Sequence, residues 1–187
     1  MRNAKSATVT ALASPPMERR LAQLSDAEAI RQIYNAAVST PFTFDLRPRS
    51  LDDQENWLRA RSGAYAAVVA VDEAAEVVGF ASLSPFRDRP AYSTTVEDSV
   101  YVREDQRGRG VGRFLLTELV DVAKNHGFHS IIARIVRGND ASVALHEAAG
   151  FELVGIEREV GRKFRRWLDV VELQLLLADD ESPRDDA

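Results

Sequence analysis

Three alternating glycines and two arginines occur together in Gln106-Arg107-Gly108-Arg109-Gly110-Val111-Gly112. A strand-like run, Val100-Tyr101-Val102, lies just before them, and an amphipathic, helix-like run follows. Glycines allow a turn to bring its backbone N–H groups close to a bound anion, and the dipole of a following helix favours negative charge at its N-terminus. The pattern therefore predicts a phosphate-binding turn to which Arg107 and Arg109 add positive charge.

Four interpretations compete for this turn. A P-loop requires Gly-Lys-Ser/Thr at the start of the helix, but Gly112 is followed by Arg113 and Phe114. A dinucleotide fingerprint requires G-x-G-x-x-G after the first strand of a parallel unit, whereas these glycines are spaced G-x-G-x-G and come late in the chain. A purely structural turn would carry the conformational entropy of three glycines without a ligand. The pattern Gln/Arg-x-x-Gly-x-Gly/Ala, typical of coenzyme A-dependent acetyltransferases, matches without gaps.

The chain resembles the GNAT superfamily, and within it the phosphinothricin or methionine sulfoximine N-acetyltransferase group, over roughly Arg19 to Leu177. The resemblance rests on four segments in the family's order, which are residues 95–102, 106–112, 139–151 and 161–170. It implies acetyl-CoA as the donor, the amino group of a small amino-acid-like molecule as the acceptor, and in many members a homodimer.

Acyl transfer from a thioester to an amine requires a base for the amine, a hydrogen-bond donor for the developing oxyanion and a proton for the departing thiolate. The chain has no cysteine, which excludes a cysteinyl intermediate and favours direct attack in a ternary complex. Glu97 is the predicted general base, because it lies on the strand before the glycine turn and burial would raise its pKa toward the working pH. In the family a glutamate stands here in the same Thr-Val-Glu setting. A solvated strand glutamate is the alternative.

Three further candidates lie on the segment 139–146. Asn139 is expected to cap a helix, to bind the pantetheine arm, or both, and Ser142 lies one turn later. His146 lies two turns after Asn139 on the same face. Many GNAT members have at this position a tyrosine that is assigned to protonating the thiolate, and the phosphinothricin-type group has a histidine. His146 is therefore either a catalytic acid or a structural histidine.

The strand before the glycine turn is expected to bind pantetheine through its backbone, as an added strand would be bound. The turn itself is expected to bind the pyrophosphate, and its arginines the pyrophosphate or the 3′-phosphate. The predicted cofactor-binding residues are Val100, Tyr101, Val102, Arg107, Gly108, Arg109, Gly110, Val111, Gly112, Asn139 and Ser142.

An amino-acid-like acceptor requires a cation for its acidic group. The loop at 40–44 carries aromatic and hydroxyl side chains, residues 87–92 match the family's Arg-x-x-Tyr approach to the catalytic strand, and the basic hairpin at 163–167 shapes the site across the dimer in this family. The predicted substrate-binding residues are Thr40, Phe42, Phe44, Arg87, Arg89, Tyr92, Lys163 and Trp167. A charged edge that blocks aggregation is the alternative for the hairpin. Arg166, where glycine is frequent, and Pro41 in a shortened loop depart from the common pattern and leave the acceptor open.

Two other functions remain at this point. The first is acetylation of a protein N-terminus or a ribosomal protein, which an open basic groove would favour over a closed pocket. The second is a catalytically idle CoA-binding or dimerisation module, which the presence of both Glu97 and His146 argues against.

The composition is that of an ordinary globular domain, with 187 residues, 45% hydrophobic and 28% charged. The net charge of −5 disfavours nucleic acid as a partner, and no run approaches the roughly 20 apolar residues of a membrane span. The three histidines lack metal-site spacing, so no metal is expected. We expect a cytoplasmic protein with a disordered extension (1–17), an N-acetyltransferase domain (18–178) and an acidic, disordered tail (179–187).

Hydrophobic periodicity predicts the elements that must position these residues. Strands are expected at 19–24, 65–71, 77–84, 94–102, 131–136, 152–160 and 167–177, and helices at 26–37, 51–61, 111–126 and 141–149. Ser25 and Ser50 are the predicted caps of the first two helices. The order β-α-α-β-β-β-α-β-α-β-β implies an α+β or mixed α/β fold with one mixed sheet. The resemblance to the GNAT superfamily implies that this central sheet is mostly antiparallel and flanked by helices.

Overall fold

The computed structural model describes residues 17–177, so the predicted acidic tail and all of the N-terminal extension except Met17 lie outside the described residues. The predicted order of strands and helices is confirmed. The elements are β1 (Glu18–Leu21), α1 (Ala27–Val38), α2 (Leu51–Arg59), β2 (Val68–Val71), β3 (Val77–Pro85), β4 (Thr95–Val102), α3 (Val111–Asn125), β5 (Ser130–Val136), α4 (Asp140–Glu147), β6 (Glu152–Lys163) and β7 (Arg166–Leu176).

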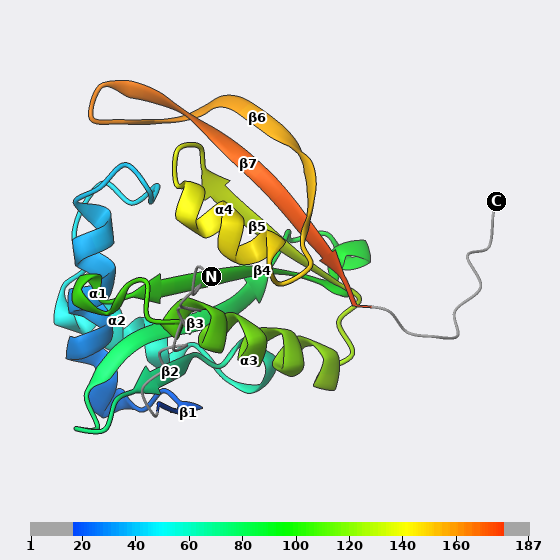
Figure 1. Ribbon diagram of the computed structural model, residues 1–187. Coiled ribbons are helices and arrows are strands. Elements are labelled where there is room, and N and C mark those ends of the chain that lie inside the picture. The colour runs from blue at the N-terminus through cyan, green and yellow to red at the C-terminus, as the bar shows by residue number, and fades with distance from the viewer. Residues whose placement is uncertain (1–16, 178–187) are drawn as a thin grey trace, which may run out of the picture.

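Within residues 17–177, seven strands form one sheet in the order β1-β2-β3-β4-β5-β7-β6 (Figure 1). The β4–β5 pair is parallel and the other pairs are antiparallel, which confirms the mixed, mostly antiparallel sheet. Alternate side chains of the strands point to opposite faces. One face packs against α3 and α4, and the other packs against α1 and α2.

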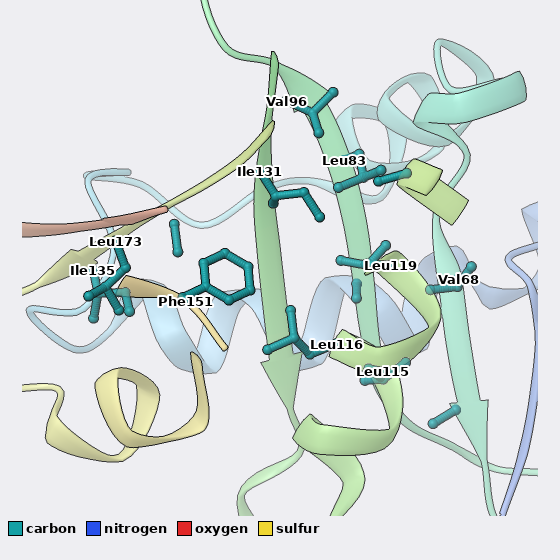
Figure 2. Packing of buried hydrophobic residues seen from close by; sticks show 14 of the residues in the cluster. Val68, Leu83, Val96, Leu115, Leu116, Leu119, Ile131, Ile135, Phe151 and Leu173 are labelled. Carbon is teal, nitrogen blue, oxygen red and sulfur yellow. The ribbon is translucent and has the colours of Figure 1, made fainter. Parts of the chain in front are cut away.

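The larger core lies under α3 (Figure 2). Leu115, Leu116 and Leu119 are fully buried against Val96 and Ile131 of the two parallel strands. The spacing of the leucines follows the 3.6-residue helical period, so one face of α3 is apolar throughout. This packing fixes the start of α3, and therefore the glycine turn, relative to β4.

Some predicted boundaries are wrong. Ser25 does not cap α1, because the Asp26 carboxylate accepts hydrogen bonds from the Gln23 N–H (2.7 Å) and from Arg20 (2.6 Å) and thereby forms a 3-10 turn ahead of the helix. The same turn ends β1 at Leu21 rather than at residue 24. The cap at Ser50 is confirmed, since its Oγ accepts a hydrogen bond from the Asp53 N–H at 3.1 Å.

Candidate active site

The two parallel strands part in the middle of the sheet. Residues 95–97 of β4 pair with residues 130–132 of β5, and Glu97 opposite Ile132 is the last pair, although β4 continues to Val102 and β5 to Val136. On its other side β4 remains paired with β3 up to Val102. Beyond Glu97, the β5-facing edge of β4 therefore offers backbone groups that no strand of the described chain uses, at the predicted pantetheine-binding residues Val100, Tyr101 and Val102.

The glycine turn lies at the end of this free edge. A 3-10 turn, Glu104–Gln106, leads into it, and α3 begins directly after Gly110. Gly108 and Gly110 have φ of 72° and 87°, a left-handed backbone that glycine adopts without strain. A Cβ built on Gly108 would meet nothing within 4 Å, so the space over the turn is open. Open space, free N–H groups of a first helical turn and the helix dipole together suit a pyrophosphate.

The two arginines of the turn lie on different surfaces. Arg107 lines an open cavity of about 850 Å³ together with Val102 and Arg103, between α1 and the end of β4. Arg109 lines a separate cavity of about 380 Å³, and its Nη1 donates to Gln106 Oε1 at 3.0 Å. The sequence pattern does not distinguish the two arginines, whereas the structure places them along different cavities.

The third glycine of the turn has a packing role. A Cβ on Gly112 would lie 3.1 Å from Leu145 Cδ2, so α4 approaches the first turn of α3 closely. Asn139 is the N-terminal flanking residue of α4, and Ser142 lies in its first turn. Gly112 thus allows α4, the helix that begins after Asn139 and contains Ser142, to pack closely against the first turn of α3.

His146 is buried, with 4% of its surface exposed. Its Nδ1 lies 2.7 Å from the Ser142 carbonyl oxygen, and its Nε2 lies 3.0 Å from Asp98 Oδ2 on β4. The Asp98 carboxylate raises the pKa of His146 against the opposing effect of burial, which is the larger single influence. Sequence reasoning assigned Asp98 no role. Because both ring nitrogens have partners, transfer of a proton to a thiolate would require one of these bonds to break, and the acid role of His146 stays a prediction.

Glu97 lies half-buried where the strands part, on the sheet face opposite Asp98. Burial raises the pKa of Glu97, and the nearby Arg134 guanidinium opposes that rise. Arg134 of β5 is paired with the carboxylate of Glu157 on β6, and its Nε lies 4.0 Å from Glu172 Oε2 on β7. Sequence reasoning missed these three residues. A half-buried carboxylate with a raised pKa is suited to accept a proton near neutral pH.

The predicted loop and hairpin meet within one chain. Lys163 Nζ, near the end of β6, donates to the Thr43 carbonyl oxygen at 3.0 Å and to Thr43 Oγ1 at 3.1 Å. Lys163 is only 5% exposed, and burial lowers its pKa. Phe44 lies against Gly161, where a Cβ would be 2.0 Å from the ring. The β6–β7 hairpin, which lies above α4 in Figure 1, therefore contacts the α1–α2 loop through Lys163 and Gly161.

The other predicted substrate-binding residues make contacts in separate parts of the structure. Thr40 Oγ1 donates to the Ala37 carbonyl oxygen in the last turn of α1, and Phe42 is exposed. Trp167 is 58% exposed, with Arg162 5.3 Å from its ring centroid. Arg87 lies over the rings of Phe86 (4.7 Å) and Tyr92 (5.7 Å), and Arg89 is exposed beside them. The contacts of Arg87 thus lie within the 86–92 loop, and among residues 17–177 no hydrogen bond or ion pair joins Arg87 to Glu97.

A polar network on α1 and the following loop was also missed. Tyr34 OH donates to Asp45 Oδ2 at 2.5 Å, and Arg49 lies 3.6 Å above the Tyr34 ring. Tyr34 in turn packs edge-on against Tyr101, with ring centroids 5.1 Å apart. Burial and the hydrogen bond to Asp45 raise the pKa of Tyr34. The network joins the α1–α2 loop to the strand that carries Glu97.

Two broader properties of residues 17–177 bear on function. They contain no group of three or more His, Cys, Asp or Glu side chains arranged to hold a metal ion. None of the helices in this part of the chain is long and apolar enough to span a bilayer.

The residues that form the separated parallel strands β4 and β5 and the glycine turn fall within a segment that matches a known protein family. Residues 20–171 match the model of the acetyltransferase (GNAT) domain. The chain belongs to the GNAT acetyltransferase family. The matched residues include Glu97, the glycine turn and α4.

Named relatives agree with this assignment. The chain is 44% identical over 161 residues to an L-methionine sulfoximine/L-methionine sulfone acetyltransferase of Pseudomonas aeruginosa, covering 84% of this chain and 93% of the relative. A phosphinothricin acetyltransferase from Sinorhizobium meliloti, solved with acetyl-CoA, is 36% identical with a TM-score of 0.83, covering 91% and 95% of the two chains. A ribosomal-protein-alanine N-acetyltransferase from Brucella melitensis is 40% identical with a TM-score of 0.83, covering 86% and 99%.

Proposed function

We propose that this GNAT domain transfers the acetyl group of acetyl-CoA to the amino group of a small amino-acid-like acceptor of the phosphinothricin, methionine sulfoximine or methionine sulfone type. The observation that carries the proposal is the place of Glu97, half-buried where β4 and β5 part. The names of the P. aeruginosa and S. meliloti relatives support the donor and the class of acceptor.

The residues of the site fit the donor. The N–H groups around Gly108 and Gly110 and the first turn of α3 would hold the pyrophosphate, and the free edge of β4 would hold pantetheine. Bound acetyl-CoA supplies an activated thioester carbonyl. Glu97 accepts a proton from the acceptor's ammonium, and the resulting amine attacks the thioester carbonyl directly in a ternary complex. The C–S bond then breaks, and the departing CoA thiolate takes up the proton that the attacking nitrogen loses as the amide forms. A protonated His146 places a positive charge beside Asp98, between α4 and β4.

We propose that the acceptor lies between Glu97 and the loop–hairpin contact, with Phe42 and Phe44 on one side and Trp167 on the other. Lys163 supports the loop through Thr43 in this arrangement. Arg87, Arg89 and Tyr92 remain the predicted cations and aromatic contact for the acidic group of the acceptor.

We also propose a homodimer that uses the edge strand β6. Exposed apolar side chains gather along this strand at Leu153, Val154, Ile156 and Val160. An exposed, apolar edge strand is a template for pairing with another strand or surface. Sedimentation equilibrium should give twice the monomer mass, and a monomer at every accessible concentration would contradict the dimer.

The function is tested by release of CoA thiol from acetyl-CoA over a panel of acceptors. Turnover is expected with methionine sulfone, methionine sulfoximine or phosphinothricin. Turnover only with peptides that begin with the N-terminus of a ribosomal protein would favour the second candidate, which the B. melitensis relative supports. Binding of acetyl-CoA without turnover on any amine would indicate a non-catalytic module.

Arg134→Gln is expected to move the acidic limb of the pH profile of kcat/KM to higher pH. The guanidinium lowers the pKa of Glu97, so its removal leaves the effect of burial unopposed and keeps Glu97 protonated to a higher pH. Arg137→Gln is the control, since Arg137 follows β5 but pairs with Asp169 at 3.2 Å. An acidic limb that stays in place in Arg134→Gln would contradict the proposed role of Glu97.

Gly161→Ala is expected to displace Phe44 and raise KM for the acceptor, with little change in KM for acetyl-CoA. The added methyl group would lie 2.0 Å from the Phe44 ring, which must rotate away. Gly155→Ala, on the same strand with nothing within 4 Å of the new Cβ, is the matched control. Equal acceptor KM values in the two variants would remove Phe44 from the proposed pocket.

A further inference from the structure

A buried ion pair joins β4 to α4. These elements bound the proposed cofactor groove, by which we mean the free edge of β4 beyond Glu97, the glycine turn and the start of α4. Asp98 lies on β4 one residue beyond the last β4–β5 pair, and His146 lies on the last turn of α4. The bond between His146 Nε2 and Asp98 Oδ2 is 3.0 Å long, and the two side chains are 5% and 2% exposed. It therefore joins α4 to the face of β4 that packs against it, at the level where backbone pairing between β4 and β5 has already ended.

The hydrogen-bond partners of His146 define its charge. A carbonyl oxygen only accepts, so Nδ1 must donate its hydrogen to the Ser142 carbonyl. An ionised Asp98 carboxylate likewise only accepts, so the two contacts suit an imidazolium, which carries a hydrogen on each ring nitrogen. Within residues 17–177, Asp98 is the ionisable group that acts on His146, and the Phe151 ring packs edge-on against it at 5.0 Å.

Asp98 depends on His146 in the same way. Its second oxygen, Oδ1, is buried and has no hydrogen-bond partner among the described residues. The charge of this carboxylate is therefore balanced by the imidazolium through one oxygen alone. Loss of the proton from His146 would leave a buried carboxylate without a cation, which is a costly state that the fold can relieve by moving α4 away from β4.

The position of α4 matters to the cofactor groove at two places. Asn139 and Ser142, the predicted pantetheine residues, lie at the start of α4. Leu145 packs against Gly112 in the first turn of α3, directly after the glycine turn. A shift of α4 would therefore disturb both the pantetheine and the pyrophosphate ends of the groove.

We propose that Asp98 is a positioning residue that holds α4 against β4 through His146, so that acetyl-CoA binds more weakly as alkaline pH discharges the pair. The inference rests on the proposed function, since it concerns binding of the same donor. The sign follows from linkage. His146 has its pKa raised in the folded protein, so the contribution of the pair is complete below about pH 6.5 and is lost as the pH rises through the folded pKa.

The test is calorimetric titration with acetyl-CoA alone, without an acceptor, from about pH 7 to about pH 9.5. Acetyl-CoA has no free thiol, and its phosphate monoester is ionised above about pH 6, so the charge of the ligand is constant. The Kd of the unmodified protein is expected to rise about fivefold or more over this range. Asp98→Asn should show the weaker affinity already at pH 7 and lose the pH dependence. His126→Gln, which removes an exposed histidine at the end of α3, should follow the unmodified protein.

A pH-independent Kd in the unmodified protein, or an Asp98→Asn variant that binds normally at pH 7, would overturn the inference. No binding at any pH would instead overturn the proposed function, and with it the effect on the cofactor. Nitrogen-15 NMR of the histidine rings in the unmodified protein tests the pair itself and requires no variant to fold. Two protonated ring nitrogens on His146 at pH 7 are expected, and a neutral ring would contradict the pair.

Discussion

Replacement of Glu97 with glutamine is expected to lower kcat by about 10²- to 10⁴-fold at neutral pH, the range that a positioned general base contributes. Glutamine keeps the size of the side chain but cannot accept the proton of the acceptor's ammonium. The remaining activity should rise with pH, because more of the acceptor then arrives as the free amine. Thiol release over a range of pH, with saturating acetyl-CoA, measures both effects.

The fold should tolerate this change. Burial raises the pKa of Glu97, which means that the folded environment disfavours its charged form, and a neutral amide removes that charge. Glu152→Gln, at an exposed position on β6, is the control and should retain full activity. A Glu97→Gln variant with unchanged turnover and an unchanged pH profile would assign the base to another group or to water.

Phe80→Ala is expected to reduce the free energy of unfolding by about 3–5 kcal/mol, the usual cost of truncating a fully buried aromatic residue. Phe80 is 1% exposed on β3. Its ring stacks on Tyr101 at 5.1 Å and meets Trp57 edge-on at 6.0 Å, so it fixes α2 and β4 on the same face of the sheet. Urea denaturation followed by circular dichroism gives the change directly.

Phe164→Ala provides the comparison for this loss. Phe164 is 57% exposed in the turn between β6 and β7, and its replacement should change stability by no more than about 0.5 kcal/mol. Similar losses in the two variants would mean that the face under α1 and α2 is not the tightly packed layer that the structure shows.

Features that depend on local spacing were predictable from the sequence. The leucine stripe of α3 follows helical periodicity, and the Ser50 cap is a local exchange of hydrogen bonds. The glycine turn is equally local, because Gly108 and Gly110 adopt the left-handed backbone that their lack of a side chain permits. The order of the elements then implied the mixed sheet.

Features that depend on distant partners were not predictable. Asp98 meets His146 from 48 residues away, and Lys163 meets Thr43 from 120 residues away. Arg134 and Glu172 alternate with apolar residues on their strands, a pattern that predicts solvent-facing side chains. The β5–β7 register places these two residues opposite one another. Residues that have no distinctive sequence pattern therefore become neighbours of Glu97 only through strand pairing in the sheet.

The hairpin turn shows a local failure of sequence reasoning. The strands were expected to end at residue 160 and to resume at 167, but they extend to Lys163 and from Arg166. The turn places Phe164 and Arg165 at φ of 49° and 64°, in the left-handed region that favours glycine. Because neither residue is glycine, the sequence gives no signal for so tight a turn.

The most direct test of the proposed chemistry follows the acetyl group itself. The protein is incubated with acetyl-CoA labelled with carbon-13 in the acetyl group and with methionine sulfone, and the products are analysed by mass spectrometry. We predict that the label moves to the amino nitrogen of methionine sulfone and that Glu97→Gln slows this transfer by the factor given above. Label that remains on acetyl-CoA, or appears only as free acetate, with every acceptor of this class would contradict the proposed function.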